Sequence, residues 1–293
     1  MKKYLKQVES EAIYIIREAY ASFKNPVLLY SIGKDSGVMV RLCQKAFYPG
    51  KIPFPLMHID TGFKFKEMYQ FRDKFIAENK LKLITHVNGE ALAAHCNPNS
   101  YGTDTCCYNL KTTALLEGIE ENGFDAAFGG ARREEEKSRA KERVFSVRDK
   151  NGQWDPKNQK PELWNLYNTF IKEGETVRVF PLSNWTEVDV WNYIKEEEIP
   201  VVPLYFAKKR SMRKQENGIL IPATDWDRDA EDIMCRFRSL GCTPCTGAIE
   251  STAETVDDII EELKAFDRSE RENRLIDLSG DSAMEDKKRE GYF

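Results

Sequence analysis

The segment from Val27 to Gly37 carries residues that could hold a phosphate chain. It reads Val-Leu-Leu-Tyr-Ser-Ile-Gly-Lys-Asp-Ser-Gly, an apolar run followed by a loop of small and polar residues and a helix-compatible stretch. A strand that ends at Ser31, followed by a helix from about residue 38, would direct backbone N–H groups and the positive end of a helix dipole at one point. Lys34 would add a full positive charge, and Gly33 would let the backbone approach a ligand closely. The segment therefore predicts a pyrophosphate site.

The spacing of this loop differs from that of the kinase-type phosphate loop. That motif has Ser or Thr directly after its Lys, whereas here Asp35 follows Lys34. The order Ser-x-Gly-Lys-Asp-Ser resembles instead the pyrophosphate loop of the ATP pyrophosphatases, which cleave ATP between the α and β phosphates and transfer AMP to an oxygen. The alternative interpretation is a strand-to-helix turn that binds no ligand.

Composition indicates a globular protein of ordinary polarity. The chain has 293 residues, 41% of them hydrophobic and 31% charged, which is enough for one large α/β domain or one domain with an extension. The net charge of −4 gives no overall field that attracts nucleic acid. The longest apolar runs are too short to span a membrane, and the polar amphipathic start of the chain favours a cytoplasmic location. Seven cysteines in such a setting suggest thiols or metal ligands and not a disulfide scaffold.

The order of the expected elements predicts the fold class. Strands are expected at 26–30, 56–59, 83–87, 125–129 and 177–180, and helices at 2–22, 37–47, 65–79, 109–121, 186–197 and 255–266. This alternation predicts a doubly wound α/β fold with a mainly parallel sheet and helices on both faces. The loops after three of the strands should then meet in one crevice at the carboxyl ends of the strands.

The pattern loosens after about residue 205. We expect a nucleotide-binding domain over 1–205 and an irregular, partly helical C-terminal extension over 206–293. The polar tail from about residue 267 is expected to wrap a neighbouring protein or a second copy of the chain, so that a homodimer is one possibility.

A charged segment over 129–143 holds six basic and four acidic residues. One interpretation is a solvated helix face with ion pairs four residues apart, such as Glu135 with Arg139. The other starts from position, because Arg132 and Arg133 directly follow an expected strand and a Gly pair. Arginine grips tetrahedral oxyanions with two parallel hydrogen bonds, so these two residues are candidates for holding an acceptor oxyanion.

Several longer stretches resemble one known family. They are Ser31–Ser36, His58–Gly62, Phe124–Arg143, Trp154–Gln159, Val179–Thr186 and Gly291–Phe293. These stretches are similar to the small subunits of bacterial sulfate adenylyltransferases, which belong with the phosphoadenosine-phosphosulfate reductase-like adenine nucleotide α-hydrolases. In that family the small subunit works with a GTPase large subunit, which drives an otherwise unfavourable reaction.

The resemblance also assigns roles to single residues. It implies that the ATP phosphates are held by Ser31, Gly33, Lys34, Asp35 and Ser36. It places Asp60 near the nucleotide, where it could position Mg²⁺ or the ribose, and it turns Arg132 and Arg133 towards the acceptor.

Four cysteines depart from the pattern of that family. Cys106 and Cys107 are adjacent, and Cys242 and Cys245 form a C-x-x-C in a turn, whereas the family pattern has a cysteine only at the position of 242. The set resembles the cluster ligands of iron–sulfur reductases that share this fold, which predicts a [4Fe–4S] cluster. Structural zinc, unrelated buried thiols and a transient disulfide are the alternatives. The chain has no cysteine after Cys245, so the C-terminal nucleophile of those reductases is missing.

These observations predict an ATP pyrophosphatase that transfers AMP to an oxyanion. In-line attack on the α phosphorus would be assisted by the loop amides, Lys34 and Mg²⁺ on the leaving pyrophosphate. His58 is interpreted first as a packed residue at a strand end and second as a proton donor.

The sulfur-related cysteines favour activation of a DNA phosphate oxygen for sulfur insertion, in the manner of phosphorothioation systems, with a cysteine desulfurase and DNA-modification subunits as partners. Adenylylation of sulfate is the principal alternative, thiolation of RNA or of a metabolite a further one, and a non-catalytic iron–sulfur scaffold the last.

Overall fold

Two β-sheets organise the protein. The computed structural model describes residues 2–216, 218–224, 227, 229–265 and 287–291. The main sheet has six strands in the order β3-β2-β1-β4-β6-β5. The strands are β1 (Pro26–Leu29), β2 (Leu56–Ile59), β3 (Leu83–His86), β4 (Ala126–Phe128), β5 (Phe145–Arg148) and β6 (Thr176–Val179). All neighbours pair in parallel except β5, which runs antiparallel to β6 at the edge.

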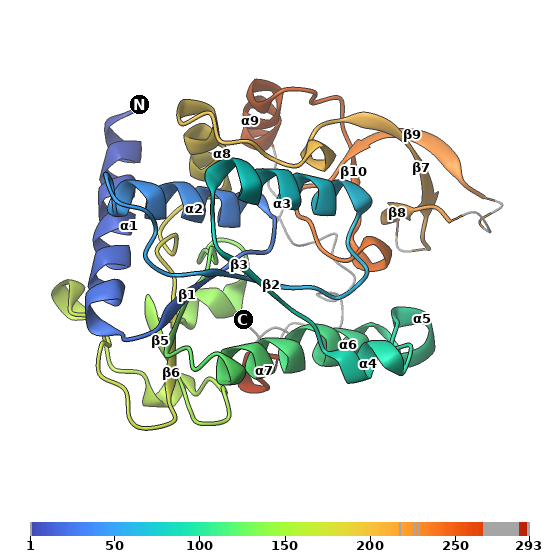
Figure 1. Ribbon diagram of the computed structural model, residues 1–293. Helices are drawn as coiled ribbons and strands as arrows, with labels where there is room; N and C mark the ends of the chain where they lie inside the picture. Colours follow the sequence, from blue (N-terminus) through green and yellow to red (C-terminus); the bar gives the residue numbers. More distant parts are fainter. Residues whose placement is uncertain (1, 217, 225–226, 228, 266–286, 292–293) are drawn as a thin grey trace.

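Helices cover both faces of this sheet, as the alternating pattern predicts (Figure 1). Helices α1 (Lys3–Ser22), α2 (Lys34–Ala46) and α3 (Lys66–Asn79) pack with α8 (Glu187–Glu196) and α9 (Val256–Lys264) into the larger apolar core. The opposite face carries α7 (Ala114–Glu121), preceded by the short helices α4 (Gly89–Ala93), α5 (Pro98–Tyr101) and α6 (Thr103–Cys107). The fold is therefore a doubly wound, mainly parallel α/β sheet.

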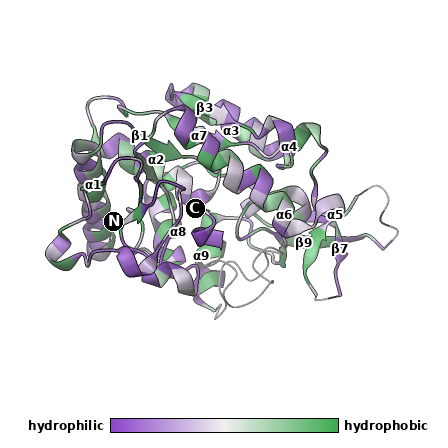
Figure 2. Ribbon diagram, turned by 90° about the horizontal axis from the view of Figure 1, so that it is seen from below, coloured by the Kyte–Doolittle hydropathy of each residue, from purple (hydrophilic) through white to green (hydrophobic). Residues whose placement is uncertain are grey.

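Local sequence explains the main elements. The central strands β1 and β4 are apolar along their whole length, because helices exclude water from both of their faces. Helix α1 buries one stripe that includes Leu5, Val8 and Ala12, and hydropathy colouring shows it with polar and apolar sides (Figure 2). Helix α8 begins at a capping box in which Thr186 and Asp189 satisfy each other's backbone N–H groups.

Two boundaries differ from the sequence prediction in a way that concerns the site. Helix α2 begins at Lys34 and not near residue 37, so Lys34, Asp35 and Ser36 form its first turn. The stretch expected as one helix over 109–121 is a π-helix, Tyr108–Thr113, that continues into α7. One extra residue per turn rotates the side chains of such a segment relative to a regular helix, and π-turns are frequent at functional sites.

The segment after residue 205 is more ordered than expected. It forms an antiparallel sheet of four strands in the order β10-β9-β7-β8, built from β7 (Lys208–Lys214), β8 (Leu220–Pro222), β9 (Glu231–Arg236) and β10 (Ile249–Glu250). This sheet lies beside the main one (Figure 1), and the loop before β10 contacts the turn after β2, where Thr243 N donates to Phe63 O over 2.7 Å. The division into domains at residue 205 stays a prediction.

The described end of the tail packs on its own chain. Residues 287–289 form one helical turn beside α7, and Trp154 N donates to Lys288 O over 3.2 Å. The remainder of the predicted tail, 267–286 and 292–293, lies outside the described residues.

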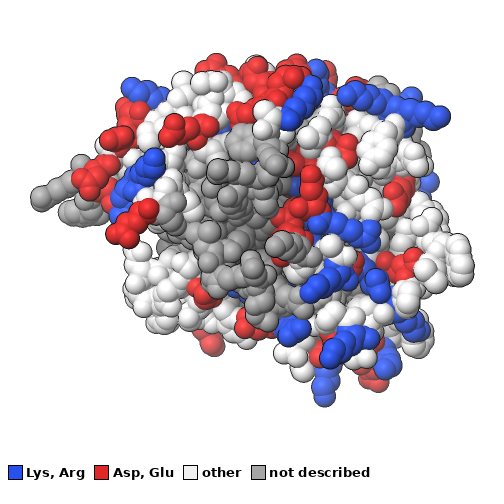
Figure 3. Space-filling view, turned by 180° about the vertical axis from the view of Figure 1, so that it is seen from behind, with Lys and Arg blue, Asp and Glu red and all other residues white. Residues whose placement is uncertain are grey.

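The face in Figure 3 carries acidic and basic side chains interspersed, without a field of one sign. Among the described residues, no helix combines the length and apolar character that crossing a bilayer requires.

Candidate functional site

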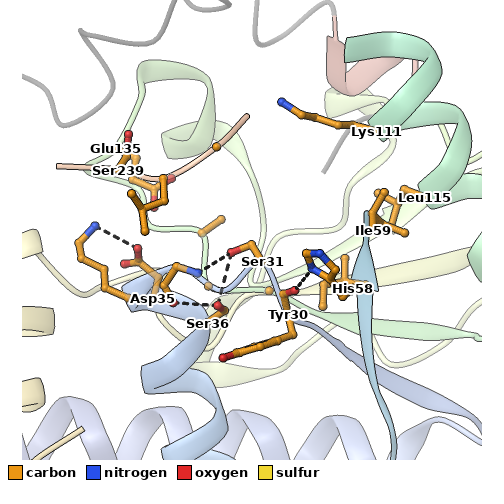
Figure 4. Close-up of a pocket in the computed structure, with 18 of the residues that line it drawn as sticks. Tyr30, Ser31, Asp35, Ser36, His58, Ile59, Lys111, Leu115, Glu135 and Ser239 are labelled. Carbon is orange, nitrogen blue, oxygen red and sulfur yellow. Dashed lines mark hydrogen bonds and ion pairs between the residues drawn. The ribbon is translucent and has the colours of Figure 1, made fainter. Parts of the chain in front are cut away.

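A cavity opens at the carboxyl ends of β1, β2 and β4, where the sequence predicts the crevice. One side is apolar and is formed by Leu29, Met57, Ile59 and Leu115. The floor consists of the loop after β1, with Ser31, Gly33, Lys34, Asp35 and Ser36, and of Gly129 and Gly130 after β4. The structure thus brings together all five residues predicted to hold phosphates, and Figure 4 shows several of them around the cavity.

The loop after β1 is held in one shape by its own hydrogen bonds. Ser36 Oγ donates to Gly33 O over 2.8 Å, and Lys34 N donates to the Tyr205 hydroxyl over 2.8 Å. Ile32 adopts φ of +68°, a left-handed conformation that is costly for a β-branched residue. The strained residue turns the chain sharply from β1 into α2, so that the helix N-terminus faces the cavity.

Asp35 connects the two halves of the floor. Its Oδ2 lies 3.1 Å from Lys34 Nζ, and its Oδ1 accepts a hydrogen bond from Arg132 Nε over 2.9 Å. Gly130 packs directly on Asp35, because an added Cβ would lie 2.9 Å from the Asp35 Cβ. The loop after β4 therefore approaches α2 as closely as glycine allows.

The two predicted acceptor arginines do not line the cavity. Arg132 is only 1% exposed and pairs with Glu134 and Glu135 as well as with Asp35. Arg133 donates from Nη1 to Asn184 Oδ1 over 2.5 Å on the outside of the segment. In this structure Arg132 contacts Asp35, and Arg133 connects the segment to the loop before α8. Contact of either residue with an acceptor stays a prediction.

Asp60 also lies apart from the residues that line the cavity. Its Oδ1 accepts hydrogen bonds from Gly62 N over 2.9 Å and from the Tyr69 hydroxyl over 2.6 Å. Burial would raise the pKa of Asp60, but the bonds from Tyr69 and Gly62 lower it below its usual value. The carboxylate therefore shapes the turn after β2, and its predicted role at the nucleotide stays a prediction.

His58 is the packed strand-end residue of the first interpretation. Its ring lies at the floor of the cavity, and Nδ1 donates to Tyr30 O over 2.9 Å (Figure 4). Burial lowers the pKa of His58 to about 4, so the ring is neutral at physiological pH. Because a carbonyl can only accept, the proton sits on Nδ1, and Nε2 has none to donate.

Sequence reasoning missed three cations that line the cavity. Lys64 follows β2, Lys111 lies in the π-helix and Arg139 lies in the charged segment. Figure 4 shows Lys111 reaching over the cavity from the side opposite Asp35. Lys111 could have been found from its position near the start of the helix expected over 109–121. The N-terminal end of that helix points towards the crevice.

The four predicted cluster cysteines lie in one buried region, where each is close enough to affect the pKa of a neighbouring thiol. Cys107 Sγ accepts a hydrogen bond from Lys111 Nζ over 3.4 Å, and Cys242 Sγ lies 3.2 Å from the Thr61 hydroxyl. Cys106 packs with Cys96 in a small apolar cluster. Burial, followed by the neighbouring thiols, raises the pKa of Cys106 to about 12, and burial, followed by Cys107, raises the pKa of Cys245 to about 11.

This arrangement does not fit an iron–sulfur cluster. Within the described part of the chain, no group of three or more His, Cys, Asp or Glu side chains is arranged to hold a metal ion. Two of the four sulfurs are directed to hydrogen-bond partners instead. The predicted cluster therefore gains no support from the described residues.

Comparison with known proteins assigns the family. Residues 25–248 match the phosphoadenosine phosphosulfate reductase domain. A sulfate adenylyltransferase subunit 2 of Azotobacter vinelandii is 57% identical over an alignment of 301 positions, which covers 99% of this chain and 98% of the relative. A protein of the same name from Phocaeicola vulgatus is 57% identical over 297 residues, which cover 99% and 97%.

Solved structures agree on the fold. An FMN adenylyltransferase of Candida glabrata superposes with a TM-score of 0.52 at 16% identity and covers 93% of this chain and 88% of its own. By fold and by sequence over almost its whole length, the chain belongs to the sulfate adenylyltransferase subunit 2 family, within the phosphoadenosine phosphosulfate reductase domain group.

Proposed function

We propose that the protein transfers AMP from ATP to sulfate, releasing pyrophosphate, as the small subunit of a cytoplasmic sulfate adenylyltransferase with a GTPase large subunit. The observation that carries the proposal is the loop over 31–36, held in one shape at the mouth of β1 with a helix N-terminus and a buried ammonium group facing the cavity. Family membership at 57% identity supports sulfate as the acceptor.

The chain's own groups act mainly by position and charge. The N-terminus of α2 and Lys34 would take up the negative charge that develops on the leaving pyrophosphate. The apolar side, formed by Leu29, Met57, Ile59 and Leu115, suits the adenine base. His58 carries no proton at Nε2, so the reaction is proposed to proceed without a protein acid, which transfer to an already ionised oxyanion does not need.

Mg²⁺ fits this site only as a companion of the nucleotide. The two carboxylates that line the cavity, Asp35 and Glu135, are engaged by Lys34, Arg132 and Arg139. When bound to the ATP phosphates, Mg²⁺ would supply further charge neutralisation, with most of its ligands from phosphate and water.

We place the acceptor oxyanion at Lys64 and Lys111. Both residues line the cavity, and both act on the same sulfur: burial would raise the pKa of Cys242, but Lys111 and Lys64, with the Thr61 hydroxyl, lower it. Two ammonium groups that influence one atom create a positive potential at this end of the cavity. An oxyanion there would face the loop of residues 31–36 across the cavity, which leaves the α phosphorus between them.

No specific observation favours the transfer of AMP to a DNA phosphate oxygen. That prediction depends on sulfur chemistry at a metal cluster, and the four cysteines do not fit one. The relatives carry the name of the alternative. A desulfurase and DNA-modification subunits as partners are therefore not part of the proposal.

The decisive experiment measures pyrophosphate from ATP with the large subunit and GTP present. Release that depends on sulfate supports the proposal, whereas sulfate-independent release of ADP and inorganic phosphate contradicts it. Release that depends on DNA and a sulfur donor would restore the other acceptor.

The acceptor position is tested with Lys111→Met. Loss of one charged hydrogen bond should raise the KM for sulfate about 10- to 100-fold and change the KM for ATP less than about twofold. Lys74→Met, on the exposed side of α3, is the matched control. An equal rise in both KM values would place Lys111 at the nucleotide instead.

A further inference from the structure

The described C-terminal turn contacts two stretches of chain, 103–121 and 129–143, that each carry residues lining the cavity. At the first stretch, Lys287 Nζ lies 3.1 Å from Asp104 Oδ1 of α6, and Gly291 packs on Leu116 of α7 so closely that an added Cβ would lie 2.9 Å from Leu116 Cδ1. The adjacent Leu115 lines the cavity. In the charged segment over 129–143, Lys288 contacts Glu142 and Ser138. The turn formed by residues 287–291 thus contacts both of these stretches.

Lys288 is a fully buried cation whose charge is paired and hydrogen-bonded. It is 0% exposed, and its Nζ lies 3.1 Å from Glu142 Oε2 and donates to Ser138 Oγ over 2.9 Å. The ammonium group also lies 5.3 Å from the centroid of the Trp154 ring. Burial of a charge is costly unless it is paired and hydrogen-bonded, so these contacts fix where Ser138 and Glu142 can be.

Those two residues flank Arg139, which lines the cavity. Arg139 lies in the 3₁₀ turn Lys137–Lys141, and Glu142 N donates to Arg139 O over 3.2 Å. Its Nε lies 3.2 Å from Glu135 Oε2, another lining group. Glu135 in turn pairs with Arg132, which holds Asp35 of the phosphate loop. A chain of contacts therefore runs from the C-terminal turn to the floor of the cavity: ion pairs at both ends, joined by the backbone hydrogen bond from Glu142 to Arg139.

We propose that the C-terminal turn, residues 287–291, is a clasp that sets the geometry of the cavity, and that Lys288 is the residue that positions Arg139 within it. The assignment of an effect to the acceptor rests on the proposed function; the positioning of Arg139 does not. Lys288 touches no reactant, so it is a positioning residue. Its removal should leave the fold standing and displace the turn that carries Arg139.

The charge of Lys288 supplies a second readout. The ammonium group is faced by Glu142, Arg139 and Glu136 of the charged segment, with Arg148 behind Glu142. Burial lowers the pKa of Lys288 to about 8, although Glu142 opposes the shift. The pairing is therefore present below about pH 8 and is lost as pH rises through that value.

The experiment compares Lys288→Met with the wild-type chain in the complex with the large subunit. Misplacement of Arg139 should lower kcat/KM for sulfate about 10- to 100-fold while the Kd for ATP changes less than about threefold. Hydrogen exchange at the amides of Arg139 and Glu142 should be about tenfold faster, with the rest of the main sheet unchanged. Lys264→Met, the same substitution at an exposed lysine of α9, is the control.

Two further variants keep the test decisive. Lys288→Arg retains the charge, so it should restore most of the activity and move the alkaline limb of the pH profile upwards. If Lys288→Met does not fold, Ser138→Ala removes the hydroxyl that accepts from Lys288 Nζ and donates to Glu136, and it should shift kcat/KM and exchange in the same direction.

A Lys288→Met protein with a lower Tm but wild-type kcat, KM and exchange at 137–142 would overturn the proposal. If the wild-type complex shows no sulfate-dependent release of pyrophosphate, the proposed function fails, but hydrogen exchange and ATP affinity still decide whether the clasp positions Arg139.

Discussion

Lys34 combines burial with charge at the point where β1 turns into α2. Its side chain is 1% exposed, and its Nζ lies 3.1 Å from Asp35 Oδ2. The ammonium group is therefore fixed in place before a nucleotide binds, which is the condition under which a charge contributes most to a transition state.

We expect Lys34→Ala to lower the rate of pyrophosphate release at least about 100-fold, because one preorganised charge on the leaving group is lost. The measurement is a coupled pyrophosphate assay at saturating ATP. The circular dichroism spectrum should remain that of the wild type. Activity within a factor of about three of the wild type would remove Lys34 from the mechanism.

Arg132 and its neighbour Arg133 provide a matched pair. Arg132→Met should lower the free energy of unfolding by roughly 1–3 kcal/mol, because Asp35 and Glu135 each lose a cationic partner and keep Lys34 and Arg139, respectively. Arg133→Met should change it by less than about 0.5 kcal/mol, as surface substitutions usually do. Urea unfolding of both variants checks the difference, and equal values would contradict the assigned roles.

The sequence could locate these residues but not their partners. Position after a strand and a Gly pair places Arg132 near the crevice, and that much is confirmed. Whether a guanidinium group faces a ligand or a carboxylate depends on Asp35, which is 97 residues away in the chain and meets Arg132 only in the folded sheet. The same reason explains why Lys111 went unnoticed: its approach to the cavity depends on a π-helix.

At the scale of elements, the loop after β4 and the first turn of α2 approach each other as closely as glycine allows. Gly130→Ala would place a Cβ 2.9 Å from the Asp35 Cβ and 3.1 Å from the Asp35 carbonyl carbon, so the two segments must separate. We expect at least about tenfold weaker ATP binding by calorimetry. Gly89→Ala, which meets nothing within 4 Å, should bind ATP as the wild type does.

The parallel strands were predictable because each is a short apolar run between helices. Strands β1, β2, β3, β4 and β6 agree with the predicted ranges to within one residue at each end. The second sheet was not predictable on that basis. In β7 six of seven residues are polar or charged, and Met212 is its one buried side chain, so the alternation that identifies a strand is missing. Its backbone pairing with β9 and β8 creates the strand.

For the molecule as a whole, the two buried ion pairs that Glu142 makes with Arg148 and with Lys288 predict a loss of stability in acid. Burial would raise the pKa of Glu142, but Arg148, Lys288 and Arg139 lower it to about 2. A carboxyl with a depressed pKa stabilises the folded state above its unfolded value of 4.5, and this contribution is lost as pH falls from about 4.5 towards 2.

The free energy of unfolding, measured between pH 2 and 5, should therefore fall less steeply in Glu142→Gln than in the wild type. The Gln variant should also be less stable at pH 7, because Lys288 and Arg148 lose their anion. Parallel pH slopes for the two proteins would show that Glu142 does not carry this titration.

The cavity is covered by chain that follows residue 205. Ser239, Leu240 and Gly241 lie over the phosphate loop, and the bridge of Lys64 with Cys242 ties this cover to the turn after β2. In a polypeptide that stopped at residue 205, the ATP site would be a groove with one side open to solvent. Conversely, a bound nucleotide would contact both the main sheet and the segment after residue 205 and so stabilise their association. Thermal unfolding or proteolysis of that segment should therefore be slower in the nucleotide-bound protein than in the empty one.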